Sequence, residues 1–291
     1  CKDKNIHDDA IIKQLVKKAF KLDEFSGENG QVVTLYDIPG LKANRIILYG
    51  LGELETIDSE ALRCMAGRTV KKCIKKKLPD LWFAVPDSPR MKIEISSTLK
   101  AMQEGAFLGN HIFSKYKAEK KKKPLKQINF RVAPQLVGKL RRISSKVIAV
   151  CRGTNQAREW VSTPSNEKTP EKFTRSIANL ARKHNLKVQV LKEAQLKQKK
   201  LGALLAVAAG SQSKPSLVIM EHRVTGAKKT AVLVGKGVTF DSGGLNIKTG
   251  ASISDMKSDM AGAAAVAATM MTAAQLKTKL NIIGVIPIVE N

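Results

Sequence analysis

The chain has 291 residues, of which 43% are hydrophobic and 26% are charged, and this composition excludes an intrinsically disordered protein. Lys and Arg total 51 against 25 acidic residues, so the formal net charge is +26 and polyanions such as DNA are potential partners. No apolar stretch reaches the roughly 18 residues that a transmembrane helix needs, so no membrane association is expected.

The basic residues are scattered along the chain, with short runs at 75–77 and 120–123, and aromatic residues make up only 4%. Scattered lysines are more typical of a solvated surface than of a nucleic-acid interface, so DNA binding is the alternative function and not the first one. The four cysteines form no C-x-x-C pair, and no signal peptide is recognisable. We therefore expect reduced thiols in a cytoplasmic protein.

The first half of the chain predicts alternating helices and strands. Helices are expected at 8–20, 59–75 and 96–115, and strands at 31–38, 45–51, 81–85 and 128–132. This alternation indicates an α/β domain with a mostly parallel sheet, spanning residues 1–145.

The second half predicts a further α/β unit. Residues 134–161 favour one long helix, and the segment 146–166 is expected to link the two domains. The second domain, 167–291, is predicted to hold helices at 170–184 and 259–276 and strands at 187–191, 203–208, 217–221, 230–234 and 281–289.

The candidate site is the stretch 231–248, AVLVGKGVTFDSGGLNIK. A buried strand is followed by a glycine-rich segment that carries Lys236, Asp241 and Lys248, and Asp259 comes shortly before the next helix. Ligands of open α/β sheets bind beyond the carboxyl ends of the strands, which is where these residues are expected. The Asp241 and Asp259 carboxylates could bind a metal ion, Lys236 could join them after losing its proton, and a charged Lys248 could polarise a carbonyl.

Other interpretations of this stretch are simpler or different. It lacks the spacing of a phosphate-binding loop, and DSGG around Ser242 resembles a serine-protease nucleophile only in isolation, because that fold is all-β. Taken singly, each lysine is explained by a solvated surface, and Asp259 by the N-cap or the first turn of a helix. Spacing alone does not decide between these explanations.

The segments VGKGVTFDSGGLNIK and SDMKSDMAGAAAV resemble the signature of the leucyl aminopeptidase (cytosol aminopeptidase) family of two-metal peptidases. Similar matches occur in four other segments, so that the resemblance covers nearly the whole chain: 36–53, 154–173, 201–222 and 281–291. The fold that it implies is an N-terminal α/β domain joined by a long helix to an α/β catalytic domain.

The resemblance implies that Lys236, Asp241 and Asp259 are metal ligands, that Asp241 bridges two divalent ions (manganese or zinc), and that Lys248 is the catalytic lysine. The implied reaction releases N-terminal residues, Leu preferred, from peptides by attack of a metal-bridged water. Members of the family commonly form hexamers, and some bacterial members also bind DNA.

One departure from the family pattern is large. The Asp-x-Glu-x-Arg motif, which completes both metal sites, is absent from the 291 residues. We therefore expect a partial chain whose catalytic domain is incomplete, which binds at most one metal ion firmly and hydrolyses peptides poorly or not at all. A non-catalytic scaffold is a third possibility, but it gives no reason to keep this cluster of charges.

Overall fold

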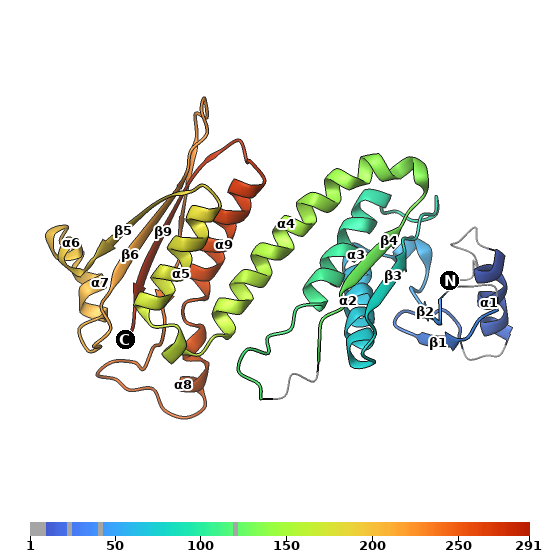
Figure 1. Ribbon diagram of the computed structural model, residues 1–291, viewed down its shortest axis with the longest axis horizontal. Coiled ribbons are helices and arrows are strands. Elements are labelled where there is room, and N and C mark those ends of the chain that lie inside the picture. The colour runs from blue at the N-terminus through green and yellow to red at the C-terminus, as the bar shows by residue number, and fades with distance from the viewer. Residues whose placement is uncertain (1–9, 22–24, 40–42, 119–121) are drawn as a thin grey trace. The chain divides into compact units, whose positions relative to one another are not determined.

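The computed structural model describes residues 10–21, 25–39, 43–118 and 122–291. The chain divides into two compact units, residues 1–148 and 149–291 (Figure 1). The long helix α4 (Val137–Ser162) crosses the boundary between them.

The first unit contains two separate pairs of strands among its described residues. β1 (Val32–Tyr36) pairs with β2 (Arg45–Tyr49) in antiparallel fashion, and β3 (Asp80–Ala84) pairs with β4 (Gln127–Arg131) in parallel. The helices of this unit are α1 (Ala10–Lys21), α2 (Ser59–Lys75) and α3 (Ile95–Gly109).

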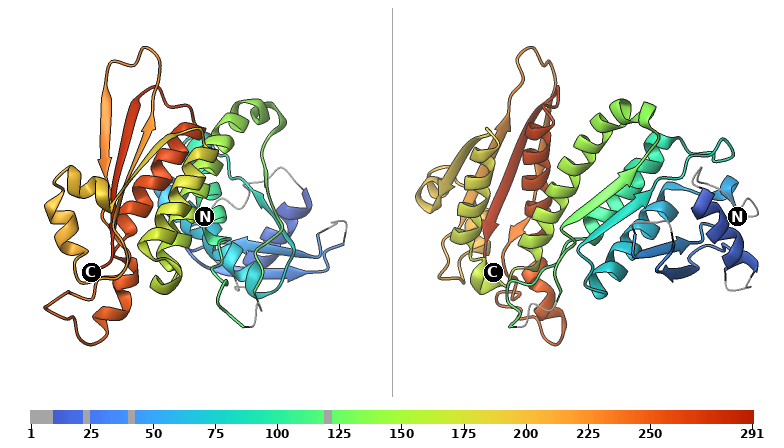
Figure 2. Two further views of the ribbon diagram at one scale, coloured as in Figure 1. Left: turned by 60° about the vertical axis from the view of Figure 1, so that its left-hand side comes forward. Right: turned by 45° about the vertical axis from the view of Figure 1, so that its right-hand side comes forward.

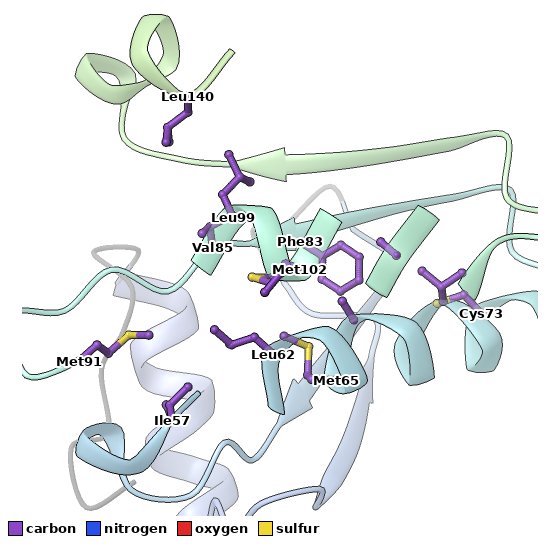
Figure 3. Close-up of a cluster of buried hydrophobic side chains, with 14 of the residues drawn as sticks. Ile57, Leu62, Met65, Cys73, Phe83, Val85, Met91, Leu99, Met102 and Leu140 are labelled. Carbon is purple, nitrogen blue, oxygen red and sulfur yellow. The ribbon is translucent and has the colours of Figure 1, made fainter. Parts of the chain in front are cut away.

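Helices α2 and α3 cross at unusually close range because glycines stand at the contact. A Cβ atom on Gly105 would lie 2.0 Å from the carbonyl oxygen of Arg63, so no larger residue fits there without a backbone shift. The apolar faces of the two helices meet around Leu62 and Met102, which are fully buried with Leu99 and Phe83 nearby in the same core (Figure 3).

The second unit is built around a five-stranded mixed sheet. Its strands are β5 (Lys187–Lys192), β6 (Ser216–His222), β7 (Thr230–Val234), β8 (Gly237–Val238) and β9 (Asn281–Val289). The order is β5-β6-β9-β7, and β8 pairs with the end of β9. Because β9 is antiparallel to β6 but parallel to β7 and β8, the carboxyl ends of β7 and β9 meet at one edge.

Helices α5 (Pro170–Lys183) and α9 (Ala261–Gln275) pack against this sheet (Figure 2). Their apolar side chains form one core with strands β6 and β9, centred on Phe173, Met220, Met270 and Ile286. The remaining helices, α6 (Glu193–Gln198), α7 (Gly202–Val207) and α8 (Ser252–Asp255), are short. None of the helices in the described part of the chain is long and apolar enough to cross a membrane.

The α/β class is confirmed, but the strand pairing is more mixed than the mostly parallel sheet expected for the first unit. The strand predicted at 203–208 is wrong, since the structure has helix α7 there. Its sequence, GALLAV, is rich in Ala and Leu, which are strong helix formers, and a run this short carries no decisive periodicity. The helix predicted at 96–115 ends earlier, at Gly109.

Candidate metal site

Backbone pairing with β9 fixes the loop that carries Asp241. After β7, the amide of Gly235 donates to the Val285 carbonyl at 3.0 Å, and β8 then pairs with the last residues of β9. The pairing continues past both strands, because Asn291 donates to the Phe240 carbonyl at 3.0 Å and Ser242 donates to the Asn291 carbonyl at 2.8 Å. Asp241 therefore lies in a segment held on both sides by the sheet.

Small residues bring the first turn of α9 against this loop. A Cβ atom on Gly235 would lie 2.5 Å from the Gly262 carbonyl oxygen, and one on Gly262 would lie 3.1 Å from the Lys236 nitrogen. The amide of Ala263 donates to the Lys236 carbonyl at 2.8 Å. This approach places the Lys236 Nζ 3.0 Å from the Asp259 Oδ2.

The Asp241 carboxylate is fully hydrogen-bonded. Its Oδ2 accepts a bond from the Lys248 Nζ at 2.5 Å, and its Oδ1 accepts bonds from the Asn291 Nδ2 at 2.7 Å and from the Gly243 amide at 3.0 Å. The hydrogen bond from Lys248 is the main reason why the pKa of Asp241 is lowered to about 2. Burial is the next largest cause and raises the pKa, while the bonds from Asn291 and Gly243 lower it further. Asp241 is therefore an anion at any physiological pH.

The Asp259 carboxylate is much less well satisfied. Its Oδ2 is buried and forms no hydrogen bond within the described structure, because the 3.0 Å approach of Lys236 makes an ion pair without hydrogen-bond geometry. Asp259 also does not cap α9, since Met260 holds the N-cap position and no side chain caps it. The capping explanation considered for this residue is therefore wrong.

One turn joins the two ion pairs. The short helix η4 (Met256–Ser258) precedes Asp259, whose amide donates to the Met256 carbonyl at 3.2 Å. The Lys248 Nζ also reaches the sulfur of Met256 at 3.1 Å. The Lys236–Asp259 and Lys248–Asp241 pairs consequently border the same turn.

The residues present fit a hard divalent cation. Carboxylate oxygens are preferred ligands of such ions, and the buried Oδ2 of Asp259 is an acceptor that lacks a hydrogen-bond donor. Lys236 has a side chain that is 60% exposed and therefore has room to move. Among the described residues no three His, Cys, Asp or Glu side chains gather to hold a metal. The expected ligand set is of a different kind, because one of its three members is a lysine.

Two further polar residues meet this region without having been expected there. Asn291 donates to Asp241, and the buried Lys168 donates to the carbonyl of Lys257 at 2.8 Å, two residues before Asp259. By contrast, the hydroxyl of Ser242 accepts a long 3.4 Å bond from the Gly244 amide, and no hydrogen bond found among the described residues joins it to a histidine.

Two family models match the chain. The N-terminal domain model of the cytosol aminopeptidase family matches residues 2–120, and the catalytic domain model of the same family matches residues 155–291. Among curated relatives, a probable cytosol aminopeptidase of Protochlamydia amoebophila (strain UWE25) is 34% identical, with 96% of this chain and 56% of the relative covered. A probable cytosol aminopeptidase of Geotalea uraniireducens (strain Rf4) is 36% identical, with 92% and 54% covered.

The fold of this chain is similar to that of a solved structure. The bottromycin maturation enzyme BotP, in complex with Mn, superposes with a TM-score of 0.81 at 30% identity, covering 93% of this chain and 56% of BotP. The chain thus spans about half the length of the proteins that it matches.

Proposed function

Because the chain belongs to the cytosol aminopeptidase family, we propose that its site serves the removal of N-terminal residues, Leu preferred, from peptides in the cytoplasm. The observation that carries this proposal is the meeting of the Lys236–Asp259 and Lys248–Asp241 pairs at one turn. A charged cluster of this kind costs desolvation energy, and a structural role does not require it.

We propose that Lys236, Asp241 and Asp259 hold metal ions, which would be manganese or zinc. Asp241 would hold an ion through its carboxylate, whose Oδ1 accepts two hydrogen bonds and whose Oδ2 is paired with the Lys248 ammonium. The complex of BotP with Mn supports a divalent ion in this family. Two bound ions would lower the pKa of a water molecule and polarise the scissile carbonyl.

Lys248 is proposed as the catalytic lysine. Its ammonium would donate to the carbonyl oxygen of the substrate and stabilise the negative charge that develops there, if a bound ion took its place beside Asp241. Its side chain is 33% exposed, so a peptide can reach it, while the Met256 sulfur limits where the ammonium can go.

The test uses residues 1–291 joined to the remaining part of the Protochlamydia relative, with Leu-p-nitroanilide and Mn²⁺. We expect hydrolysis, no reaction with the N-acetylated substrate, and a loss of about 100-fold or more in kcat for Lys248→Met. Lys228→Met, which removes an exposed lysine before β7, is the matched control and should retain activity. Full activity of Lys248→Met would refute the catalytic role.

The other expectations from the resemblance stay predictions. Hexamer formation is checked by light scattering of the same joined protein. DNA binding rests on the resemblance and on the net charge of +26. A gel shift at about 150 mM salt, a roughly physiological ionic strength, tests it, because binding by bulk charge alone is lost as salt rises.

A further inference from the structure

Lys168 is a lysine with almost no access to solvent. It lies between the short helix η3 (Ser165–Glu167) and α5, and only 3% of its surface is exposed. Burying an ammonium group costs free energy unless its N–H donors are satisfied. The contacts of Lys168 therefore need an explanation.

Three acceptors surround its Nζ. The carbonyl oxygens of Trp160 and Lys257 each lie at 2.8 Å, and the sulfur of Met260 lies at 3.1 Å. An ammonium has three N–H donors and no lone pair, so this surrounding complements the charged form. The two carbonyl groups carry partial charges only, so Lys168 makes its contacts with neutral acceptors.

The acceptors come from two parts of the second unit. Trp160 belongs to the last turns of α4, whereas Lys257 and Met260 stand on either side of the pair Ser258-Asp259. A single Nζ thereby ties both flanks of Asp259 to the end of α4. The Oδ2 of Asp259 accepts no hydrogen bond that would hold the carboxylate in place.

We propose that Lys168 is a positioning residue that fixes the turn 257–260 and so directs the Asp259 carboxylate at the metal site. The metal part of this inference rests on the proposed function, while the fixing of the turn does not. Burial lowers the pKa of Lys168 to about 8, with the charge of Lys257 as the second cause, and the side chain therefore still carries its third donor at neutral pH.

The test compares Lys168→Met with Lys172→Met in the 291-residue chain. Both changes remove one positive charge near the start of α5, but Lys172 is exposed, so any difference reports the contacts of Lys168. Without metal, we expect hydrogen exchange of the amides in 256–264 to rise at least about tenfold in Lys168→Met, with β5 unchanged. With Mn²⁺, we expect the dissociation constant, followed by electron paramagnetic resonance, to rise about 10–100-fold. Lys172→Met should match the wild type in both measurements.

The outcomes separate this inference from the proposed function. Unchanged exchange at 256–264 in Lys168→Met overturns the positioning role, whatever the metal affinity. Faster exchange in a chain that binds no Mn²⁺ upholds the fixing of the turn and refutes the metal site. If Lys168→Met does not fold, Lys168→Gln, which keeps two N–H donors, takes its place. The amides of 256–264 must then exchange faster in Lys168→Gln than in the wild type, and equal exchange rates overturn the proposal.

Discussion

The two carboxylates of the site differ in how the surrounding chain holds them. Asp241 receives three hydrogen bonds, from Lys248, Asn291 and Gly243, and its pKa falls to about 2. Asp259 has one ion pair to an exposed lysine and a buried oxygen without a hydrogen bond. Asp241 is therefore preorganised as an anion by its own loop and by Asn291, whereas Asp259 depends on the turn that carries it.

This difference suggests separate contributions to metal binding. Asp241 provides a fixed negative charge at the end of the sheet. The free-energy cost of partly burying this charge is already offset by the three hydrogen-bond donors around it. Asp259 is an acceptor with unused capacity, which a cation would satisfy better than Lys236 does. If the proposed metal site is right, Asp241 would decide where an ion binds, and Asp259 would contribute most of the free energy gained on binding.

The largest expected effect concerns activity of the 291-residue chain itself. With only these two carboxylates and no Asp-x-Glu-x-Arg motif, it should hydrolyse Leu-p-nitroanilide in Mn²⁺ at least about 100-fold more slowly than the full-length Protochlamydia relative. The comparison is made at equal protein concentration. Equal rates would mean that Asp241 and Asp259 suffice for activity, and would contradict the incomplete metal site expected here.

The second effect concerns the support of Asp259 by Lys168. The pKa of Lys168 is about 8 in the folded chain against an ordinary value of 10.5, so the unfolded chain binds more protons between these values. The free energy of unfolding should therefore rise with pH across that window by about 2–3 kcal/mol more in the wild type than in Lys168→Met. Urea unfolding at pH 7.5 and 10.5 measures this, and parallel pH profiles would contradict a buried, charged Lys168.

The third effect compares the carboxylates directly, without metal. Asp241→Asn turns an amide donor toward Lys248 or toward the Gly243 and Asn291 donors, and should lower the free energy of unfolding by about 2 kcal/mol. Asp259→Asn loses only an ion pair with an exposed lysine and should cost less than about 1 kcal/mol. Chemical denaturation of both variants checks the order. Equal losses would show that the two carboxylates are held alike.

Much of the fold follows from local signals in the sequence. The helices predicted at 59–75 and 170–184 are found as α2 (Ser59–Lys75) and α5 (Pro170–Lys183). Their starts have local causes, because Asp58 caps α2 through the Ala61 amide and Thr169 with Pro170 begins α5. The strand predicted where α7 is found was wrong for a physical reason, because a short run of Ala and Leu suits either a helix or a buried strand. Such runs are decided by tertiary packing, which no local pattern contains.

The site was only partly predictable. Lys236, Asp241, Lys248 and Asp259 stand in one recognisable stretch, so a family resemblance could single them out. Asn291 lies 50 residues from Asp241, and Lys168 lies 89 residues from Lys257. Neither has a sequence pattern that marks it, because contacts made across a sheet or between helices leave no local spacing.

Titration of the 291-residue chain with Mn²⁺ by calorimetry shows directly whether Asp241 and Asp259 hold a metal ion. We expect no more than one ion bound firmly per chain, and binding weakened by more than about 100-fold in both Asp241→Asn and Asp259→Asn, beyond the effect of a residue that only supports a ligand. Lys228→Met should bind as the wild type does. Binding of Mn²⁺ that survives both Asp substitutions unchanged would contradict the assignment of these residues as metal ligands.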